Sequence, residues 1–139
     1  MEKVVMVERT ASCSCGQLTV QVSGEPVRVS ICHCLACQRR TGSVFGEQAR
    51  FKREDIKEIS GVATTYVRVG DEGSEISFRF CPTCGATVYY TINDDPGLVA
   101  IPVGAFADPK FQTPVRSVYE SRKHSWVIVP DGPDVEHVD

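Results

Sequence analysis

The chain has 139 residues, of which 42% are hydrophobic and 24% charged, and its formal net charge is −3. This length fits one domain, so we expect a single domain over residues 1–139 with its core at about 8–130. The acidic balance gains little from phosphate electrostatics, and no apolar run approaches the roughly 20 residues that cross a bilayer, which argues against nucleic-acid and membrane partners.

Short strands separated by turn residues dominate the chain. Residues 18–22 and 27–31 each alternate apolar and polar side chains on either side of a Ser-Gly-Glu-Pro turn, and we expect them to form a β-hairpin. Further strands are expected at 44–51, 64–69, 76–80, 87–92, 98–103 and 115–119. Helix is limited to a turn or two after Cys34, ended by Gly42, and a second short one at 52–56. The pattern predicts a mainly β domain with a loosely held tail after Pro130.

The segment Met1 to Glu8 has too short an apolar stretch for a secretion signal, which predicts a cytoplasmic protein. In that reducing compartment clustered cysteines favour metal binding or catalysis over disulfides. The count of seven cysteines is also odd, so full disulfide pairing would leave one thiol over. The cysteines form three groups: Cys13-Ser14-Cys15-Gly16, Cys32-His33-Cys34-Leu35-Ala36-Cys37 and Cys81-Pro82-Thr83-Cys84-Gly85.

The spacing of these groups indicates two metal sites. The third group has the form of a zinc knuckle, and its site needs two more ligands, which the first or the central group can supply. In the central group, Cys37 shares a face with Cys34 if Cys34 opens a helical turn, so three sulfurs can converge and leave one tetrahedral position free. The most economical division places two Zn²⁺ per chain. A structural zinc takes Cys13, Cys15, Cys81 and Cys84, and a catalytic zinc takes Cys32, Cys34 and Cys37.

Three other interpretations of the cysteines stay open at this point. The chain can hold a single zinc with three spare thiols, one of them reactive. Cys34 and Cys37 can form a redox pair, although such a motif normally opens the helix of a βαβ unit, which this sequence does not offer. Two closed structural sites are the third alternative, with His33 as the obvious fourth ligand. Alternate residues of an extended segment face opposite ways, which favours a packing or supporting role for His33 instead.

The order Cys-x-Cys-Gly, Cys-His-Cys-x-x-Cys and Phe-Cys-x-x-Cys-Gly resembles the family of glutathione-dependent formaldehyde-activating enzymes and centromere protein V. The resemblance includes Arg39, Thr41-Gly42-Ser43 and Trp126 and spans residues 8 to 130. It implies a zinc-bound β-tent of several coiled antiparallel sheets, as in the zinc-binding Rab exchange factors, with the same division of zinc ligands. Ser117 stands where many members of the family carry a histidine, which bears on the substrate if that histidine shapes the active site.

The resemblance also implies an activity. It is a carbon–sulfur lyase that condenses a small thiol such as glutathione with formaldehyde or a related aldehyde to an S-hydroxymethyl adduct. Arg39 and Arg40 are candidates to attract the carboxylates of the thiol, and Tyr89 or Tyr90 to donate a hydrogen bond to the alkoxide. The alternative is a non-catalytic, zinc-stabilised module that binds a protein partner. We expect the large aromatic side chains to pack in the core: Phe45, Phe78, Phe80, Phe106 and Trp126.

Overall fold

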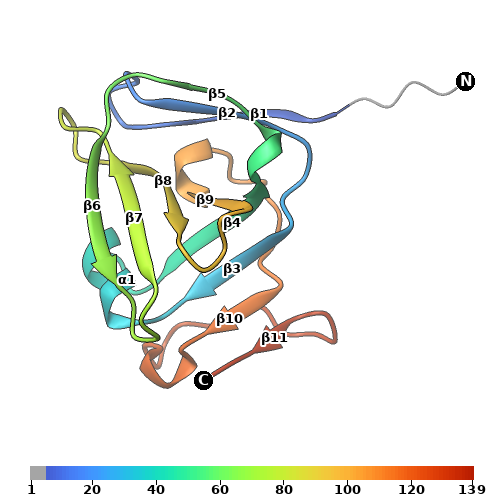
Figure 1. The fold of residues 1–139 in the computed structure, drawn as a ribbon. Coiled ribbons are helices and arrows are strands. Elements are labelled where there is room, and N and C mark those ends of the chain that lie inside the picture. The colour runs from blue at the N-terminus through green and yellow to red at the C-terminus, as the bar shows by residue number, and fades with distance from the viewer. Residues whose placement is uncertain (1–5) are drawn as a thin grey trace, which may run out of the picture.

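The computed structural model describes residues 6–139, so most of the segment considered for a secretion signal lies outside the described residues. Within that range, eleven strands form two sheets, with one α-helix and three short 3-10 helices. The mainly β class predicted from the sequence is therefore confirmed (Figure 1). No helix in residues 6–139 is both long enough and apolar enough to cross a membrane.

The smaller sheet contains three antiparallel strands in the order β1-β2-β5, namely β1 (Glu8–Ser12), β2 (Thr19–Ser23) and β5 (Ile56–Ser60). The larger sheet has the order β11-β10-β3-β4-β9-β8-β7-β6. Its strands are β3 (Arg28–Cys32), β4 (Gly46–Lys52), β6 (Thr64–Val69), β7 (Glu75–Phe80), β8 (Thr87–Ile92), β9 (Leu98–Pro102), β10 (Arg116–Val118) and β11 (Glu136–His137).

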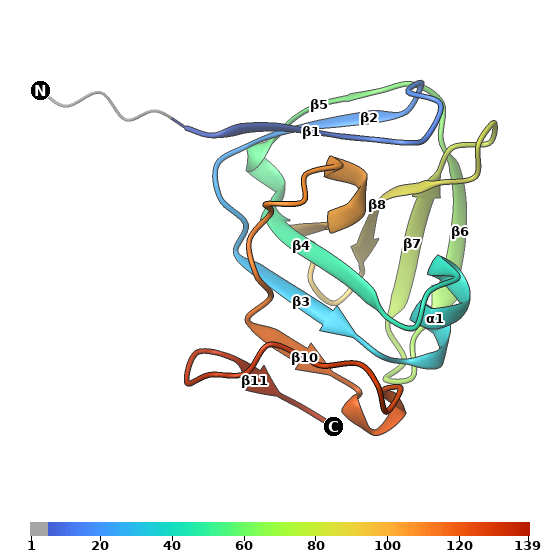
Figure 2. The same cartoon turned by 180° about the vertical axis from the view of Figure 1, so that it is seen from behind.

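The larger sheet curls, so that its two ends approach each other. The turn between β6 and β7 comes close to the segment that follows β10, and α1 (Leu35–Thr41) lies beside that turn (Figure 2). The helix ends at Gly42, whose φ of 69° is the left-handed conformation that glycine adopts readily at a helix C-terminus. The predicted helix and its stop signal are confirmed, and the second expected helix is a 3-10 turn at Arg53–Asp55.

The predicted hairpin between residues 18–22 and 27–31 is wrong. Strand β2 pairs with β1 and β5, whereas β3 pairs with β4 and β10, so the turn at Gly24 carries the chain from one sheet into the other. Period-two alternation predicts that each segment is a strand, but it carries no information about which strand lies beside it. Strands β1, β5 and β11 were not expected.

The main core lies between the two sheets. Both sheets contribute fully buried side chains. The smaller sheet supplies Val20, with Leu18 directly before β2, and the larger sheet supplies Phe51, Val88 and Ile101. The aromatic prediction holds for Phe78, which is buried, and Phe45, Phe80 and Phe106 are half-buried. The prediction for Trp126 is wrong, because 68% of this side chain is exposed.

The tail after Pro130 is held more firmly than the sequence indicated. Glu136 and His137 form β11, which pairs in parallel with β10. The imidazole Nδ1 of His137 lies 2.8 Å from Oε2 of Glu120. These contacts place the end of the chain, including Asp139, at the rim of the cavity described below.

Candidate metal centres

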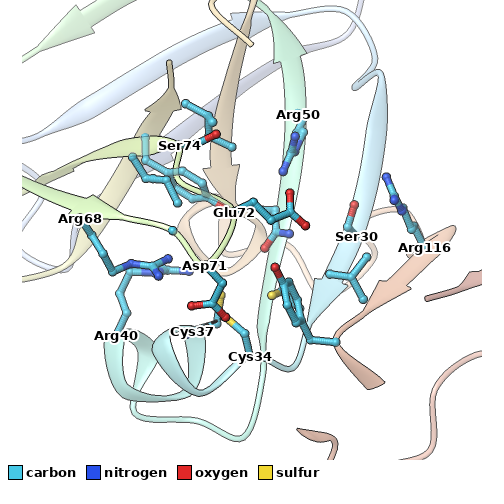
Figure 3. A pocket seen from close by; sticks show the side chains of 18 of the residues that line it. Ser30, Cys34, Cys37, Arg40, Arg50, Arg68, Asp71, Glu72, Ser74 and Arg116 are labelled. Carbon is cyan, nitrogen blue, oxygen red and sulfur yellow. Dashed lines mark hydrogen bonds between the residues drawn. The ribbon is translucent and has the colours of Figure 1, made fainter. Parts of the chain in front are cut away.

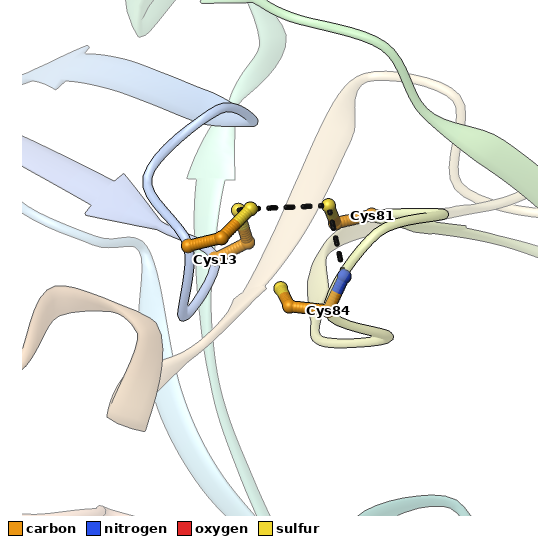
Figure 4. Close-up of side chains that lie close together, drawn as sticks. Cys13, Cys81 and Cys84 are labelled. Atoms are coloured by element: carbon orange, nitrogen blue, oxygen red, sulfur yellow. Dashed lines mark hydrogen bonds between the residues drawn. The ribbon is translucent and has the colours of Figure 1, made fainter.

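The first candidate metal centre joins two loops that are far apart in the sequence. Cys13 and Cys15 lie in the turn between β1 and β2, and Cys81 and Cys84 in the turn between β7 and β8 (Figure 4). All four sulfurs lie within 4.8 Å of one another. The structure thus brings together the four cysteines that the sequence predicted as one set.

The spacing of these sulfurs fits a tetrahedral thiolate site. The sulfurs of Cys13 and Cys15 are 3.6 Å apart, and those of Cys15 and Cys81 are 3.7 Å apart. Four sulfurs at about 2.3 Å from a central zinc ion would be separated by about 3.8 Å. The cluster therefore has the size and donor chemistry of a zinc site before any ion is considered.

Hydrogen-bond donors surround Cys81 and favour its thiolate. Although desolvation opposes ionisation, the backbone N–H groups of Cys84 and Thr83 and the amide of Gln17 lower the pKa of Cys81 to about 6. The Gln17 Nε2 donates to the sulfur at 2.9 Å and also to the carbonyl of Val62 at 2.8 Å, and the Gln17 Oε1 accepts from the Val62 N–H at 2.9 Å. Gln17 is a supporting residue that the sequence analysis missed.

The second candidate metal centre is formed by three buried cysteines. Cys32 ends β3, Cys34 is the N-terminal cap of α1, and Cys37 lies in the first turn of that helix. Their sulfurs lie within 4.8 Å of one another, and among the described residues no fourth histidine, cysteine or carboxylate joins the group. The convergence predicted from a helical turn at Cys34 is the arrangement seen.

The charge state of this trio calls for a cation. Hydrogen bonds from the thiols of Cys32 and Cys37, together with the N–H of Cys37 at 3.3 Å, lower the pKa of Cys34 to about 2. Contacts with the sulfurs of Cys34 and Cys37, together with burial, raise the pKa of Cys32. One thiolate is thus stable on its own, but a second and third at this distance need a positive ion among them.

His33 does not belong to either sulfur cluster. It is fully buried, its Nε2 lies 2.9 Å from the Ser117 hydroxyl, and its ring packs edge-on against Phe45. Burial lowers its pKa, so the imidazole is neutral at pH 7. Ser117 is also fully buried and contacts His33, whereas its neighbours Arg116 and Val118 face the cavity.

A cavity of about 320 Å³ opens onto the three-cysteine cluster. Figure 3 shows Cys34 and Cys37 beside Arg40 and Arg68, with Ser30, Arg50 and Arg116 across the cavity. The turn between β6 and β7 adds two acidic residues to the lining of the cavity, Asp71 and Glu72. Further polar and aromatic side chains line the cavity, namely Arg28, Gln48, Phe78, Tyr90 and Tyr119.

The cavity includes only some of the residues predicted to bind substrate. Arg40 lines it, with its guanidinium carbon 5.2 Å from the ring centre of Phe78 and 5.4 Å from that of Tyr90. Tyr90 lines it and is buried. Arg39 is exposed and Tyr89 is half-buried, and neither lines this cavity.

Five residues that line the cavity were not predicted from the sequence, namely Arg28, Arg50, Arg68, Arg116 and Tyr119. A partial signal existed for Arg28, because it stands four residues before Cys32 on an alternating strand and therefore shares its face. Tyr119 packs against the three cysteines and has a φ of 55°, a left-handed conformation that is uncommon for a bulky residue. Backbone outliers of this kind cluster at functional sites.

Comparison with known proteins gives one family and one fold. The model of the family described as glutathione-dependent formaldehyde-activating enzyme matches residues 8–122. Among solved structures, the chain is similar to a crystal structure of a Rhodobacter sphaeroides protein, with 22% identity and a TM-score of 0.55 over 72% of this chain and 91% of that chain. At this identity the likeness concerns the fold alone. A comparison with curated proteins finds no match.

Proposed function

Because the chain belongs to the family of glutathione-dependent formaldehyde-activating enzymes, we propose that it is a zinc-dependent carbon–sulfur lyase. In this proposal it reversibly joins a thiol such as glutathione to formaldehyde or a related small aldehyde. The observation that carries the proposal is the trio of converging sulfurs in an arginine-rich cavity, without a fourth protein ligand among residues 6–139. The reducing compartment expected from the N-terminal segment would suit a thiol substrate.

The two sulfur clusters are assigned different roles in this proposal. Cys13, Cys15, Cys81 and Cys84 would hold a structural zinc that closes the loops at the ends of β1 and β7. Cys32, Cys34 and Cys37 would hold a second zinc whose remaining position faces the cavity. Zinc bound by three thiolates acidifies a thiol that joins it, so the substrate sulfur would be a thiolate at neutral pH.

The protein side chains around the trio support thiolate chemistry. Arg40 and Arg68 line the cavity beside the cysteines, and their positive charges favour anionic sulfur there. The N-terminus of α1 at Cys34 adds a backbone N–H donor on the same side. These groups lower the free energy of any thiolate that enters the cavity relative to its thiol.

The reaction forms one carbon–sulfur bond and transfers one proton to the carbonyl oxygen. The thiolate sulfur attacks the carbonyl carbon, the carbonyl π-bond breaks, and the oxygen takes up the proton that the thiol lost, giving the S-hydroxymethyl adduct. Burial raises the pKa of both Tyr90 and Tyr119, so both phenols stay protonated. We assign Tyr119 as the residue that donates a hydrogen bond to the developing alkoxide, because its side chain packs directly on the three cysteines.

The proposal is tested by exchange NMR with ¹³C-formaldehyde and glutathione. The zinc-loaded protein should accelerate exchange between free formaldehyde and the adduct in proportion to its concentration. The Cys34→Ser variant should lose this acceleration and one of two bound zinc ions while its circular dichroism spectrum stays unchanged. A wild-type protein that carries two zinc ions and leaves the exchange rate at its spontaneous value would refute the proposed activity.

A further inference from the structure

Three arginines gather at the end of the cavity remote from the cysteines. In the pairing of β3 with β4, Arg28 lies directly opposite Arg50, and in the pairing of β3 with β10, Arg116 lies opposite Ser30. Like charges placed directly opposite one another in a sheet are destabilising. Repulsion by Arg50 and Arg116 adds to burial in lowering the pKa of Arg28. A cluster of this kind needs an anion to offset it.

The polar atoms at this end lack partners inside the protein. The Nε atoms of Arg28, Arg50 and Arg116 are buried without a hydrogen-bond acceptor among the described residues. Ser30 and Gln48 are 3% and 4% exposed, and their Oγ and Oε1 atoms are likewise unpaired. All five side chains line the same cavity. Buried polar groups are nearly always paired, so five unpaired ones around one space indicate a polar ligand.

The protein itself offsets these charges only in part, because Asp95 and Glu136 attract Arg28 without forming an ion pair with it. Glu136 lies 3.8 Å from the Arg116 Nε, beyond hydrogen-bonding distance, and its side chain is 64% exposed. Asp71, Glu72 and Asp139 also line the cavity, but no ion pair within the described residues joins them to an arginine. The mixed lining suits a zwitterionic ligand, with carboxylates at the arginines and an ammonium group near the acidic turn.

The length of the cavity matches an extended ligand rather than a small aldehyde. Arg28 and Cys32 are four residues apart on β3, which corresponds to about 13 Å along the strand. The volume of about 320 Å³ is likewise far above the ~30 Å³ that a water-sized molecule occupies. A ligand that fills this space can place one end at the sulfurs and the other among the three arginines.

We propose that Arg28, Arg50 and Arg116, with Ser30, form a carboxylate-binding subsite for the non-reacting end of the thiol substrate, where the Gln48 Oε1 accepts a hydrogen bond from an N–H of the same ligand. The identity of that substrate, a peptide-like thiol with two carboxylates, rests on the proposed function. The presence of an anion subsite rests on the arginine geometry alone. Specificity for the thiol then lies at this subsite, not at Arg39.

S-methylglutathione is a suitable probe, because it keeps both carboxylates and has no thiol to bind a metal. Its affinity for the zinc-loaded protein is measured by calorimetry at low salt, alongside its diester. The variants are Arg28→Gln and Arg50→Gln, and the control is Arg53→Gln, which removes an exposed arginine that does not line the cavity. Arg50→Lys keeps the charge and serves as the conservative variant.

Each glutamine substitution in the cavity should weaken binding roughly 10- to 100-fold, the loss expected for one charge-assisted hydrogen bond. The control should bind like the wild type, and Arg50→Lys should recover part of the affinity. Without ligand, Arg28→Gln should melt no lower than the wild type, because it removes repulsion between like charges. A purely structural arginine would instead lower the melting temperature when replaced.

The proposed subsite and the proposed activity fail in different ways. Equal affinity of S-methylglutathione and its diester, or unchanged affinity in both Arg28→Gln and Arg50→Gln, overturns the subsite even if formaldehyde exchange is catalysed. Binding that depends on these arginines in a protein that does not accelerate exchange supports the subsite and refutes the activity.

Discussion

Gly61→Ala should destabilise the protein by disturbing the support of the four-cysteine cluster. Gly61 has a φ of 100°, and a Cβ there would overlap the carbonyl oxygen of Gln17 and lie 2.8 Å from its carbonyl carbon. Gln17 in turn donates to the sulfur of Cys81. The left-handed backbone costs about 1–2 kcal/mol for a residue with a Cβ, and displacement of the Gln17 backbone adds to it. We therefore expect a loss of about 3 kcal/mol or more in the free energy of unfolding.

Two other alanine substitutions separate these contributions. Gly73 has a φ of 91°, but no atom lies within 4 Å of the place that a Cβ would occupy, so Gly73→Ala should cost only the backbone strain of about 1–2 kcal/mol. Gly97 has open space and no positive φ, and Gly97→Ala should change stability by no more than about 1 kcal/mol. Urea unfolding gives the three free energies, and a zinc-chelator assay gives the rate of metal release.

The order Gly61→Ala, Gly73→Ala, Gly97→Ala from most to least destabilised is the expected result, with faster zinc release in Gly61→Ala alone. If Gly61→Ala were as stable as Gly73→Ala, the Gln17 backbone could move away from the new Cβ without a cost in free energy. The link from Gly61 through Gln17 to the sulfur of Cys81 would then be refuted.

Three further outcomes follow from the site. Cys81→Ser should leave the chain unfolded at room temperature, whereas Cys34→Ser should remain folded, because only the four-cysteine cluster joins distant loops; circular dichroism distinguishes them. Because burial lowers the pKa of His33, the unfolded chain binds more protons at this residue below about pH 6.5, so its contribution to stability should fall there as pH decreases, by up to about 1.4 kcal/mol per pH unit, and urea titrations should show a shallower slope in His33→Asn than in the wild type. Trp126→Ala should change the unfolding free energy by less than about 0.5 kcal/mol, since the side chain is largely exposed; a larger loss in urea unfolding would contradict that placement.

The parts of the fold that could be predicted are those encoded over a few residues. Alternation located β6 and β8 with their observed bounds, and a glycine stop signal located the end of α1. The partners of the strands are set by contacts across the whole chain, which is why the hairpin between residues 18–22 and 27–31 was wrong. The exposure of Trp126 was missed for a related reason, because residue type alone does not tell which side of a segment meets the core.

The same distinction explains why the cysteines were found and the arginines were not. Cys32, Cys34 and Cys37 lie within six residues, and the two pairs of the other cluster each have a recognisable local spacing. Arg28, Arg50 and Arg116 belong to three strands, and only the register of β3 with β4 and β10 places them in one cavity. The net charge of −3 is a sum over the whole chain and says nothing about such a grouping. Alternation along β3 then puts Arg28, Ser30 and Cys32 on one face, so that one strand joins the three-cysteine cluster to the proposed carboxylate subsite.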